Sequence, residues 1–359
     1  MAAFNNVDPV LQSEKAHSDD FLYDLPDDLI AEHPANPRDA SQLMVVRREE
    51  SEKEFIRFRD VIKYLNPGDV LVVNNSKVYP AKFDTIKVET GDHIDVFLLR
   101  ELEPGVWEAQ VSPPRKVRIG NTLEFDKGLR SDIVDNTVSS GRVIQFQNRG
   151  ADTNEILREL GKMPLPRYIN REPIPSDREK YQTIFAKKPG SVAVPAGALH
   201  FTEELVNDLT DYGVHIAEIT VHLGLGGYER VTLSEIDKYS MNAEYYNISV
   251  ESADIINEAK DNGNKVIAVG ASVVRALLSS HFKGRKVIPK ENWTDLFVFP
   301  PFHFHLLDGI ISNFHQPQAP SLLMQSAFYG KEKTIEAYEV AVKEKMRFEA
   351  FGDALMILR

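Results

Sequence analysis

The spacing of hydrophobic positions changes along this chain. Between residues 83 and 149 the sequence consists of short alternating runs, such as HIDVFLLREL at 93–102 and VWEAQVS at 106–112, with turn residues between them. Several short strands at this spacing are typical of a small barrel or sandwich. From residue 158 onward, longer amphipathic stretches alternate with short apolar runs, which predicts helices between the strands of a largely parallel sheet.

Capping residues mark the helix boundaries in this second region. Thr202 can cap a helix over 203–212 that ends at Gly213. Ser272 can cap another helix over 273–282. Three more helices are expected, over 251–262, 320–329 and 332–346. Strands are expected between them and at 69–73, so strands and helices alternate along most of the chain.

The predicted fold class is therefore α/β, with a mostly parallel sheet flanked by helices and an inserted all-β, barrel-like domain. We place the inserted domain at 83–149 and a discontinuous α/β catalytic domain at 21–82 and 150–359. Residues 1–20 are polar and are expected to form a flexible tail.

Three predicted strands end in loops that are rich in glycine or contain histidine. The loops read HLGLGG at 222–227 after the strand 214–221, GAS at 270–272 after the strand 265–269, and NFH at 313–315 after the strand 309–312. Ligands of open α/β sheets bind beyond the carboxyl ends of the strands. Glycine lets the backbone approach a ligand closely, and histidine transfers protons near neutral pH. The three junctions therefore predict an active site.

Composition narrows the class of protein. The chain has 359 residues, of which 42% are hydrophobic, a net charge of −12 and no cysteine. The absence of cysteine excludes disulfides and thiol nucleophiles and is typical of a reducing compartment. We find neither a secretory signal pattern nor an apolar run of membrane-spanning length, and we expect a cytoplasmic protein.

Several single residues have both a functional and a structural interpretation. His200 precedes a helix N-terminus, where acceptors bind, but it is equally consistent with a loop histidine stacked on Phe201. Glu244 lies among tyrosines and could bind sugar hydroxyls or a base edge, or form a surface pair with Lys238. His303 and His305 would need a third ligand to hold zinc, and no metal is expected.

The segment 162–188 is basic in an otherwise acidic chain. It holds seven lysines and arginines against three acidic residues, with Tyr168, Tyr181 and Phe185 between them. Basic residues interleaved with aromatic rings are typical of surfaces that bind folded RNA or single-stranded loops. The alternative is a solvated linker between the two domains.

These segments together resemble the S-adenosylmethionine:tRNA ribosyltransferase-isomerase family of queuosine biosynthesis. The similarity runs in order along nearly the whole chain after the tail. It is carried by FLYDLP at 21–26, PRDAS at 37–41, LNPGD at 65–69, NNSKV at 74–78, PLP at 164–166, YQT at 181–183, the segments 191–202 and 222–226, 270–277, 311–315 and 347–357.

The resemblance implies an enzyme that transfers the ribosyl part of S-adenosylmethionine to 7-aminomethyl-7-deazaguanine in tRNA and isomerises it. The products would be epoxyqueuosine-tRNA, adenine and methionine, with S-adenosylmethionine as substrate and no separate cofactor. The implied partners are a tRNA of the queuosine type and S-adenosylmethionine, with no membrane, and we expect a monomer.

Proton transfer in such a reaction suits histidine. We expect His200 and His222 as catalytic residues, with His315 third. The residues expected to bind substrate are Phe201, Thr202, Gly224, Gly226, Tyr228, Glu244, Gly270, Ser272, Arg275, Asn313 and Asp353. Those expected to bind tRNA are Arg167, Arg171 and Lys180.

The chain differs from the family pattern in the loops of the expected site. Ala196, Ala271 and Gly227 replace threonines, and Gln316 replaces a leucine. The alternative function is therefore a diverged paralogue that binds tRNA or a nucleoside without this activity. A third hypothesis is a nucleotide-binding enzyme that holds phosphates with the loop 224–227.

Overall fold

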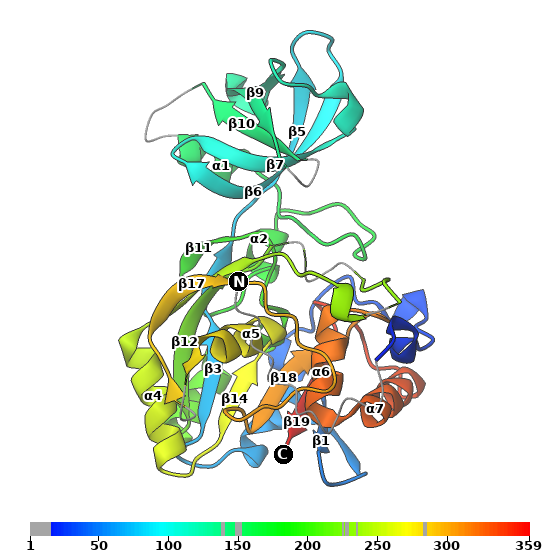
Figure 1. Ribbon diagram of the computed structural model, residues 1–359, viewed down its shortest axis with the longest axis vertical. Coiled ribbons are helices and arrows are strands. Elements are labelled where there is room, and N and C mark those ends of the chain that lie inside the picture. Colours follow the sequence, from blue (N-terminus) through cyan, green and yellow to red (C-terminus); the bar gives the residue numbers. More distant parts are fainter. Residues whose placement is uncertain are drawn as a thin grey trace.

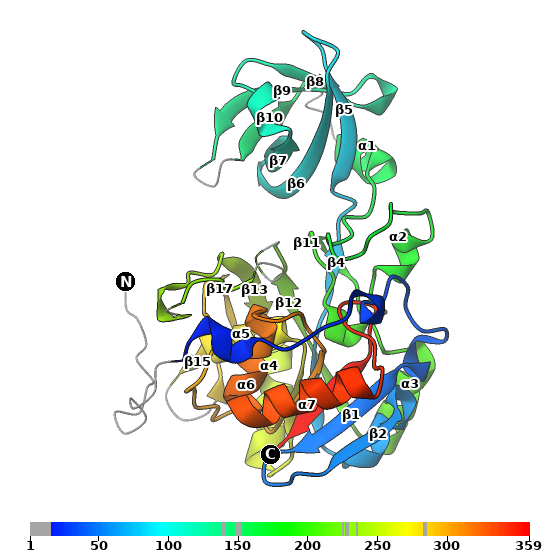
Figure 2. The same ribbon diagram turned by 90° about the vertical axis from the view of Figure 1, so that its right-hand side faces the viewer.

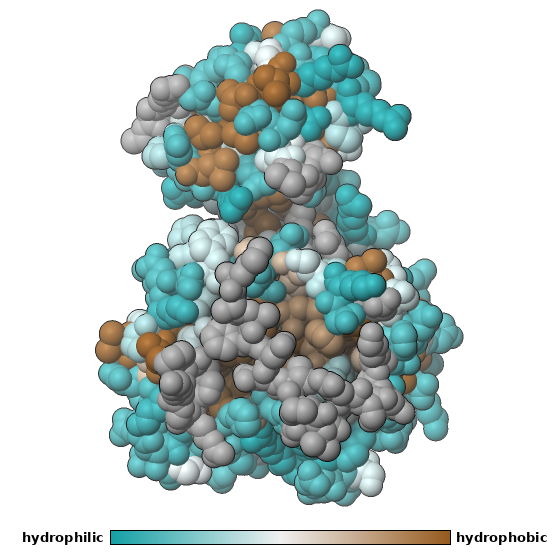
Figure 3. All heavy atoms as spheres, viewed as in Figure 1, coloured by the Kyte–Doolittle hydropathy of each residue, from teal (hydrophilic) through white to brown (hydrophobic). Residues whose placement is uncertain are grey.

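The structure is a computed structural model that describes residues 16–137, 141–147, 153–224, 226, 230–234, 236–282 and 286–359. Figure 1 shows two parts, an α/β body below and a smaller β-barrel above it. The space-filling view shows a narrow waist between them (Figure 3).

A mixed sheet forms the centre of the α/β body. In the part of the chain that the structure describes, nine strands pair in the order β17-β13-β12-β3-β14-β18-β19-β1-β2. Their bounds in that order are Lys290–Thr294, Glu244–Ile248, His215–His222, Val70–Asn74, Val266–Val269, Gly309–Asn313, Ala354–Leu358, Gln42–Arg47 and Lys53–Arg57.

Parallel pairing is concentrated in the middle of this sheet. Strands β12, β3, β14 and β18 are mutually parallel. The outer strands add antiparallel pairs, namely β13 with β12, β17 with β13, β19 with β18 and β2 with β1. The carboxyl ends of the four central strands therefore lie at one edge, which faces the barrel (Figure 1). The predicted fold class is confirmed, and the sheet is mixed because antiparallel strands flank its parallel centre.

Alternating strand residues bury the two faces of the sheet against different helices. Val70 and Val72 join one core with α4, α5, α6 and α7, while Leu71 and Val73 join a second core with α3 and the 3₁₀ segment Phe58–Tyr64. Figure 2 shows α3 on the opposite side of the sheet from α5 and α6. The helix bounds are Glu203–Tyr212 for α3, Val250–Asp261 for α4, Ala271–Ser280 for α5, Pro320–Tyr329 for α6 and Lys331–Lys343 for α7.

One of the two predicted helix caps is confirmed, and the other is wrong. The Thr202 hydroxyl accepts a hydrogen bond from the Leu205 N–H at 3.2 Å, and Gly213 ends α3 in the left-handed conformation, as predicted. The prediction that Ser272 caps a helix is wrong, because α5 begins at Ala271. Gly270, with φ +97°, turns the chain directly after β14 and so starts the helix earlier.

The barrel consists of antiparallel strands that close on themselves. Among the described residues its strand order is β10-β7-β6-β5-β8-β9. From β5 to β10 the bounds are Lys82–Lys87, His93–Glu103, Val106–Ser112, Thr122–Glu124, Arg130–Asn136 and Arg142–Phe146. Closure leaves no free sheet edge among these strands, and inward residues such as Phe83, Val96 and Phe146 fill the interior.

The chain segments that enter and leave the barrel are paired at the waist. Lys82 and Lys162 exchange backbone hydrogen bonds of 3.2 and 2.8 Å. On the barrel side of this pairing lies α1 (Thr153–Leu160), which packs on the barrel core. On the side of the body lie α2 (Asp177–Lys180) and the parallel pair of β4 (Ser76–Val78) with β11 (Lys188–Ser191). This pairing places the start of segment 162–188 between barrel and body, next to the strand ends of the sheet (Figure 1).

Candidate active site

The three strand-end loops meet around one cavity. Leu223 and Gly224 follow β12, and Ser312 and His315 lie at the end of β18. The segment 270–272 follows β14 and completes this side. The facing wall is formed by the segment 193–197, and by Tyr168, Arg230, Met241, Phe297 and Glu349. Loops that are far apart in sequence thus converge because their strands are parallel neighbours.

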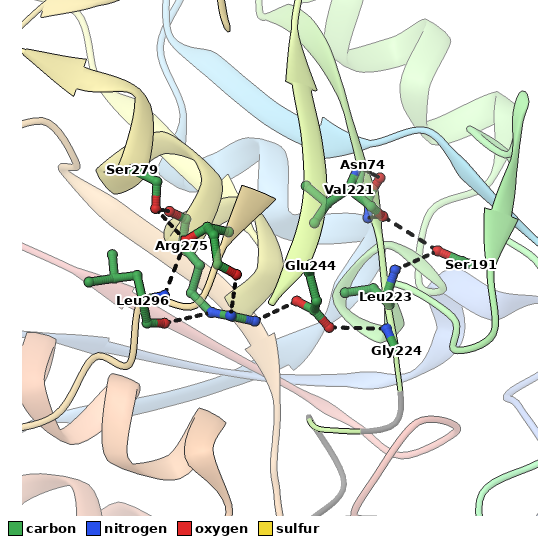
Figure 4. Close-up of polar contacts among 10 residues, drawn as sticks. Asn74, Ser191, Val221, Leu223, Gly224, Glu244, Arg275, Ser279 and Leu296 are labelled. Carbon is green, nitrogen blue, oxygen red and sulfur yellow. Dashed lines mark hydrogen bonds and ion pairs between the residues drawn. The ribbon is translucent and has the colours of Figure 1, made fainter. Parts of the chain in front are cut away.

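A buried ion pair joins two walls of the cavity (Figure 4). Glu244 is 5% exposed and forms an ion pair with Arg275, which is 6% exposed. The Glu244 carboxylate also accepts the Gly224 N–H at 3.1 Å, and the Arg275 Nε donates to the Leu296 carbonyl at 2.8 Å. These contacts fix the start of the loop after β12 against α5. The alternative of a surface pair with Lys238 is wrong, because Glu244 is buried.

Burial and ion pairing act in opposite directions on Glu244. Burial raises the pKa of its carboxyl group, and the Arg275 guanidinium and the Gly224 N–H oppose that rise. The guanidinium is itself satisfied by backbone carbonyls of Thr294 and Leu296. We infer that the pair is ionised and forms a fixed polar group in the cavity wall.

His315 is the predicted catalytic histidine that lines the cavity. Its ring Nε2 lies 3.1 Å from the Ser312 hydroxyl, and its backbone N–H donates to the Tyr338 hydroxyl at 3.2 Å. Burial lowers the pKa of the ring to about 4, so it is neutral at pH 7. A neutral imidazole offers one donor and one acceptor nitrogen to a ligand.

His200 lies in the protein core and does not line this cavity. It is 3% exposed and stacks on Phe58 at a centroid distance of 4.8 Å. Its Nδ1 lies 2.8 Å from the Ser41 hydroxyl and its Nε2 lies 3.3 Å from the Asn313 side-chain oxygen. Burial lowers the pKa of His200 to about 4. These contacts favour the structural interpretation, although the partner ring is Phe58 and not Phe201.

His222 lies beside the cavity and not in its lining. Its ring stacks on Tyr245 at 5.2 Å and covers Gly190, where an added Cβ would lie 2.6 Å from the ring. Burial lowers the pKa of the ring. Within the described residues its buried Nδ1 has no hydrogen-bond partner.

Other predicted site residues have structural contacts. Phe201 packs in the core beneath the sheet, and Thr202 caps α3. The Asn313 side chain donates to the Glu349 carbonyl at 2.8 Å, and Asp353 accepts the backbone N–H of Gln42 and Arg347 at 2.9 and 2.8 Å. Gly226 lies beside the Asn242 side chain. Tyr228 and Gly227 lie outside the described residues.

The predicted residues that line the cavity are His315, Gly224, Glu244, Gly270, Ser272 and Arg275. Three positions that differ from the family pattern also line it, namely Ala196, Ala271 and Gln316. These three differences therefore lie in the cavity wall itself.

Sequence reasoning missed Glu349, a buried carboxyl group in the cavity wall. Its side chain accepts the Gln316 N–H at 2.8 Å and hydrogen-bonds with Tyr168. Burial raises the pKa of this carboxyl to about 7. Glu349 lies between Phe348 and Ala350 in the segment 347–357, which contributes to the family resemblance, but its own sequence neighbours do not identify it as a cavity residue.

The histidine pair considered for zinc lies outside the cavity lining. His303 and His305 stack at a ring-centroid distance of 6.1 Å, and the described residues contain no group of three side chains that could hold a metal ion.

Among the described residues, none of the helices has the length and hydrophobicity that a membrane span requires.

Strand-end loops that bring proton-transfer groups to one cavity are the arrangement of an α/β enzyme. The chain belongs to the queuosine biosynthesis protein family, whose model matches residues 18–357. The resemblance inferred from the sequence is thereby confirmed.

Named relatives and a solved structure match almost the whole chain. The S-adenosylmethionine:tRNA ribosyltransferase-isomerase of Flavobacterium psychrophilum is 44% identical over 344 residues, which is 94% of this chain and 99% of that protein. The enzyme of the same name from Carboxydothermus hydrogenoformans is 45% identical over 340 residues, with the same coverage. The crystal structure of S-adenosylmethionine tRNA ribosyltransferase from Thermotoga maritima matches with a TM-score of 0.53 and 33% identity, over 94% of this chain and 100% of that one.

Proposed function

We propose that this chain transfers the ribosyl part of S-adenosylmethionine to 7-aminomethyl-7-deazaguanine in tRNA and isomerises it to an epoxycyclopentane. Adenine and methionine are released. The observation that carries the proposal is the convergence of the three strand-end loops on one cavity, in a chain whose named relatives match 94% of its length.

The cavity offers polar groups for several parts of the substrates. The segment 270–272 leads into α5, whose first-turn N–H groups favour a carboxylate such as that of the methionine part. The Glu244–Arg275 pair provides a fixed carboxylate for hydroxyl or base-edge donors. His315 is neutral at pH 7, so it can donate or accept a hydrogen bond at the adenine ring.

The reaction requires three proton-controlled events. The sulfonium acidifies the adjacent C5′ protons, one of which a base removes. An acid assists departure of adenine, and the acceptor amine must be unprotonated when it attacks. Of the predicted histidines, we propose His315 for one of the first two events, because it lines the cavity, whereas the contact of His200 with Asn313 supports a structural role for His200.

The decisive experiment is turnover with defined RNA. The protein is incubated with S-adenosylmethionine and tRNA that carries the aminomethyl deazaguanine, and adenine and methionine are quantified by chromatography. We expect release of both with this tRNA and none with the same tRNA bearing guanine. Absence of release by well-folded protein would contradict the proposed function.

The segment 162–188 is proposed as part of the tRNA surface, with one predicted residue reassigned. Arg171 makes a bidentate ion pair with the buried Asp177 at 2.7 and 2.8 Å and donates to the Glu32 carbonyl. These contacts support a structural role for Arg171. Arg167 is exposed, and within the described residues neither Arg167 nor Lys180 has an ion-pair partner.

Salt dependence of tRNA binding tests this surface. Changing Arg167 and Lys180 to Ala should reduce the slope of log affinity against log salt by about 0.7–0.9 for each phosphate that is no longer neutralised. The Arg171→Ala variant should instead lower the unfolding midpoint, because the buried Asp177 would lose its bonded guanidinium. An unaltered slope in the double variant, measured by filter binding, would place the RNA surface elsewhere, for example around Arg115 and Arg118 of the barrel.

A further inference from the structure

The cavity contains two buried carboxyl groups in different electrostatic settings. Glu244 is joined to Arg275, and its charge is thereby balanced. Glu349 is 6% exposed and forms no ion pair within the described residues. The charge of Arg230 lowers the pKa of Glu349, but Arg230 donates its hydrogen bond to the Gln316 side chain, at 2.6 Å. A buried carboxylate without a bonded cation is suited to meet a cation on a ligand.

The backbone fixes Glu349 beside His315. The Glu349 N–H donates to the Phe314 carbonyl at 2.9 Å, and the Glu349 carbonyl accepts the Asn313 amide at 2.8 Å. The residue has φ +69°, a conformation that side-chain-bearing residues rarely adopt. Such positions occur where the surrounding structure over-determines them, often at functional sites. The side chain is therefore held in a defined place at the end of β18.

A hydrogen bond links Glu349 to Tyr168 of segment 162–188. The Tyr168 hydroxyl hydrogen-bonds to the carboxyl group, and Tyr168 is half-buried. Tyr168 belongs to segment 162–188, which leaves the barrel and is the proposed RNA-binding segment. The Glu349 carboxyl is therefore hydrogen-bonded to a residue of the segment that we propose as part of the tRNA surface.

We propose that Glu349 binds the protonated amine of the acceptor base and removes its proton. This inference rests on the proposed function. The N–H bond breaks and an O–H bond forms on the Glu349 carboxylate, so that the ammonium becomes a neutral amine and the carboxylate a neutral acid. The nitrogen lone pair is then free to attack carbon. The sulfonium of S-adenosylmethionine carries no proton on sulfur and cannot take part in this exchange.

The acidity of the two groups makes the transfer feasible. An alkyl amine has a pKa of about 10.4 and an ordinary glutamate one of about 4.3, a gap of about six pKa units. Because burial raises the pKa of Glu349 to about 7, the gap falls to about three. Ionised Glu349 is the proton acceptor, so activity should decline as the pH falls below about 7.

Binding calorimetry tests the proposal without turnover. At pH 7 wild-type Glu349 is about half protonated, so binding of the ammonium should release about half a proton. The release is measured in two buffers of different ionisation enthalpy, with tRNA bearing the aminomethyl deazaguanine and the same tRNA bearing guanine. We expect the extra release only with the amine, and its loss in Glu349→Gln. The exposed Glu344→Gln serves as the matched control and should behave like wild type.

Turnover gives an independent readout. We expect adenine release by Glu349→Gln to fall by roughly 10²–10⁴-fold at pH 7. The deficit should shrink as the pH approaches the pKa of the free amine, because the amine then loses its proton to water. Glu349→Asp retains a carboxylate and should recover part of the rate. Affinity for S-adenosylmethionine alone should stay within about threefold of wild type.

The outcomes separate this inference from the proposed function. If wild type releases adenine but Glu349→Gln still shows the extra proton release, Glu349 is not the acceptor and the inference fails alone. A rate deficit that is equal at every pH would indicate a structural role and overturn it as well. Proton release on binding S-adenosylmethionine alone would place Glu349 against that substrate and also overturn the inference. If wild type releases no adenine, the proposed function fails, whatever the proton counts.

Discussion

Replacing Arg275 with methionine is expected to destabilise the protein by about 3–5 kcal/mol, because it leaves Glu244 as an unpaired buried charge. Methionine fills most of the volume of the arginine stem, so the change removes charge and hydrogen bonds more than packing. Arg275 also donates to the carbonyls of Thr294 and Leu296, which would be left without these donors.

Urea unfolding at pH 7 measures this effect, with two controls. Lys286→Met removes an exposed ion pair with Asp261 of 2.7 Å and should cost less than about 1 kcal/mol. The double variant Glu244→Gln with Arg275→Met should regain much of the stability, because no unpaired charge remains. Equal destabilisation in Arg275→Met and Lys286→Met would show that the buried pair does not hold the loop after β12.

The parts of this fold that follow from local sequence could be predicted. The capping of α3 depends on Thr202 and Gly213, and both act within one helical turn of their own positions. The barrel strands follow from alternation within each run. The carboxyl-end loops could be grouped as one site because parallel strands share an edge, and Gly224, Gly270 and His315 do line one cavity.

Other features depend on contacts between distant residues, which periodicity does not encode. The final strand, Ala354–Leu358, is uniformly buried and lies between β18 and β1, antiparallel to one and parallel to the other. A run that is apolar throughout contains no information about its direction. For the same reason Glu349 was missed, since its partners Gln316 and Tyr168 are brought to it only by the fold.

The three histidines show this limit within the site. Each follows or precedes a predicted element, and each has a pKa lowered by burial, but only His315 reaches the cavity. His200 is bound by Ser41 and Asn313, which are 159 and 113 positions away in the sequence. A histidine next to a predicted element therefore indicates the region of a site, but it does not show that the histidine lines the site.

The core position of His200 predicts how stability depends on pH. The pKa of His200 is about 4 in the folded protein and about 6.5 in the unfolded chain. Between these pH values the imidazole is protonated in the unfolded chain and neutral in the folded protein. Stability should therefore fall as the pH is lowered from about 6.5 to about 4, by about 3 kcal/mol from this group. His200→Gln keeps hydrogen-bonding groups but cannot titrate. It should be less stable than wild type at pH 7, because the stacking on Phe58 is removed, and should lose less stability on acidification.

Unfolding midpoints between pH 4 and 8 test this prediction, with His33→Gln as an exposed control that should run parallel to wild type. Turnover measured at a temperature where both proteins are folded completes the experiment. Because His200 does not line the cavity, we expect its effect in the midpoint and a rate within about threefold of wild type. A fall in adenine release of roughly 10²–10⁴-fold, the size expected for loss of a general acid or base, would instead assign His200 to the chemistry. In that case at least one of the ring contacts, with Ser41 or with Asn313, would have to break during the reaction, since both ring nitrogens are occupied in the structure.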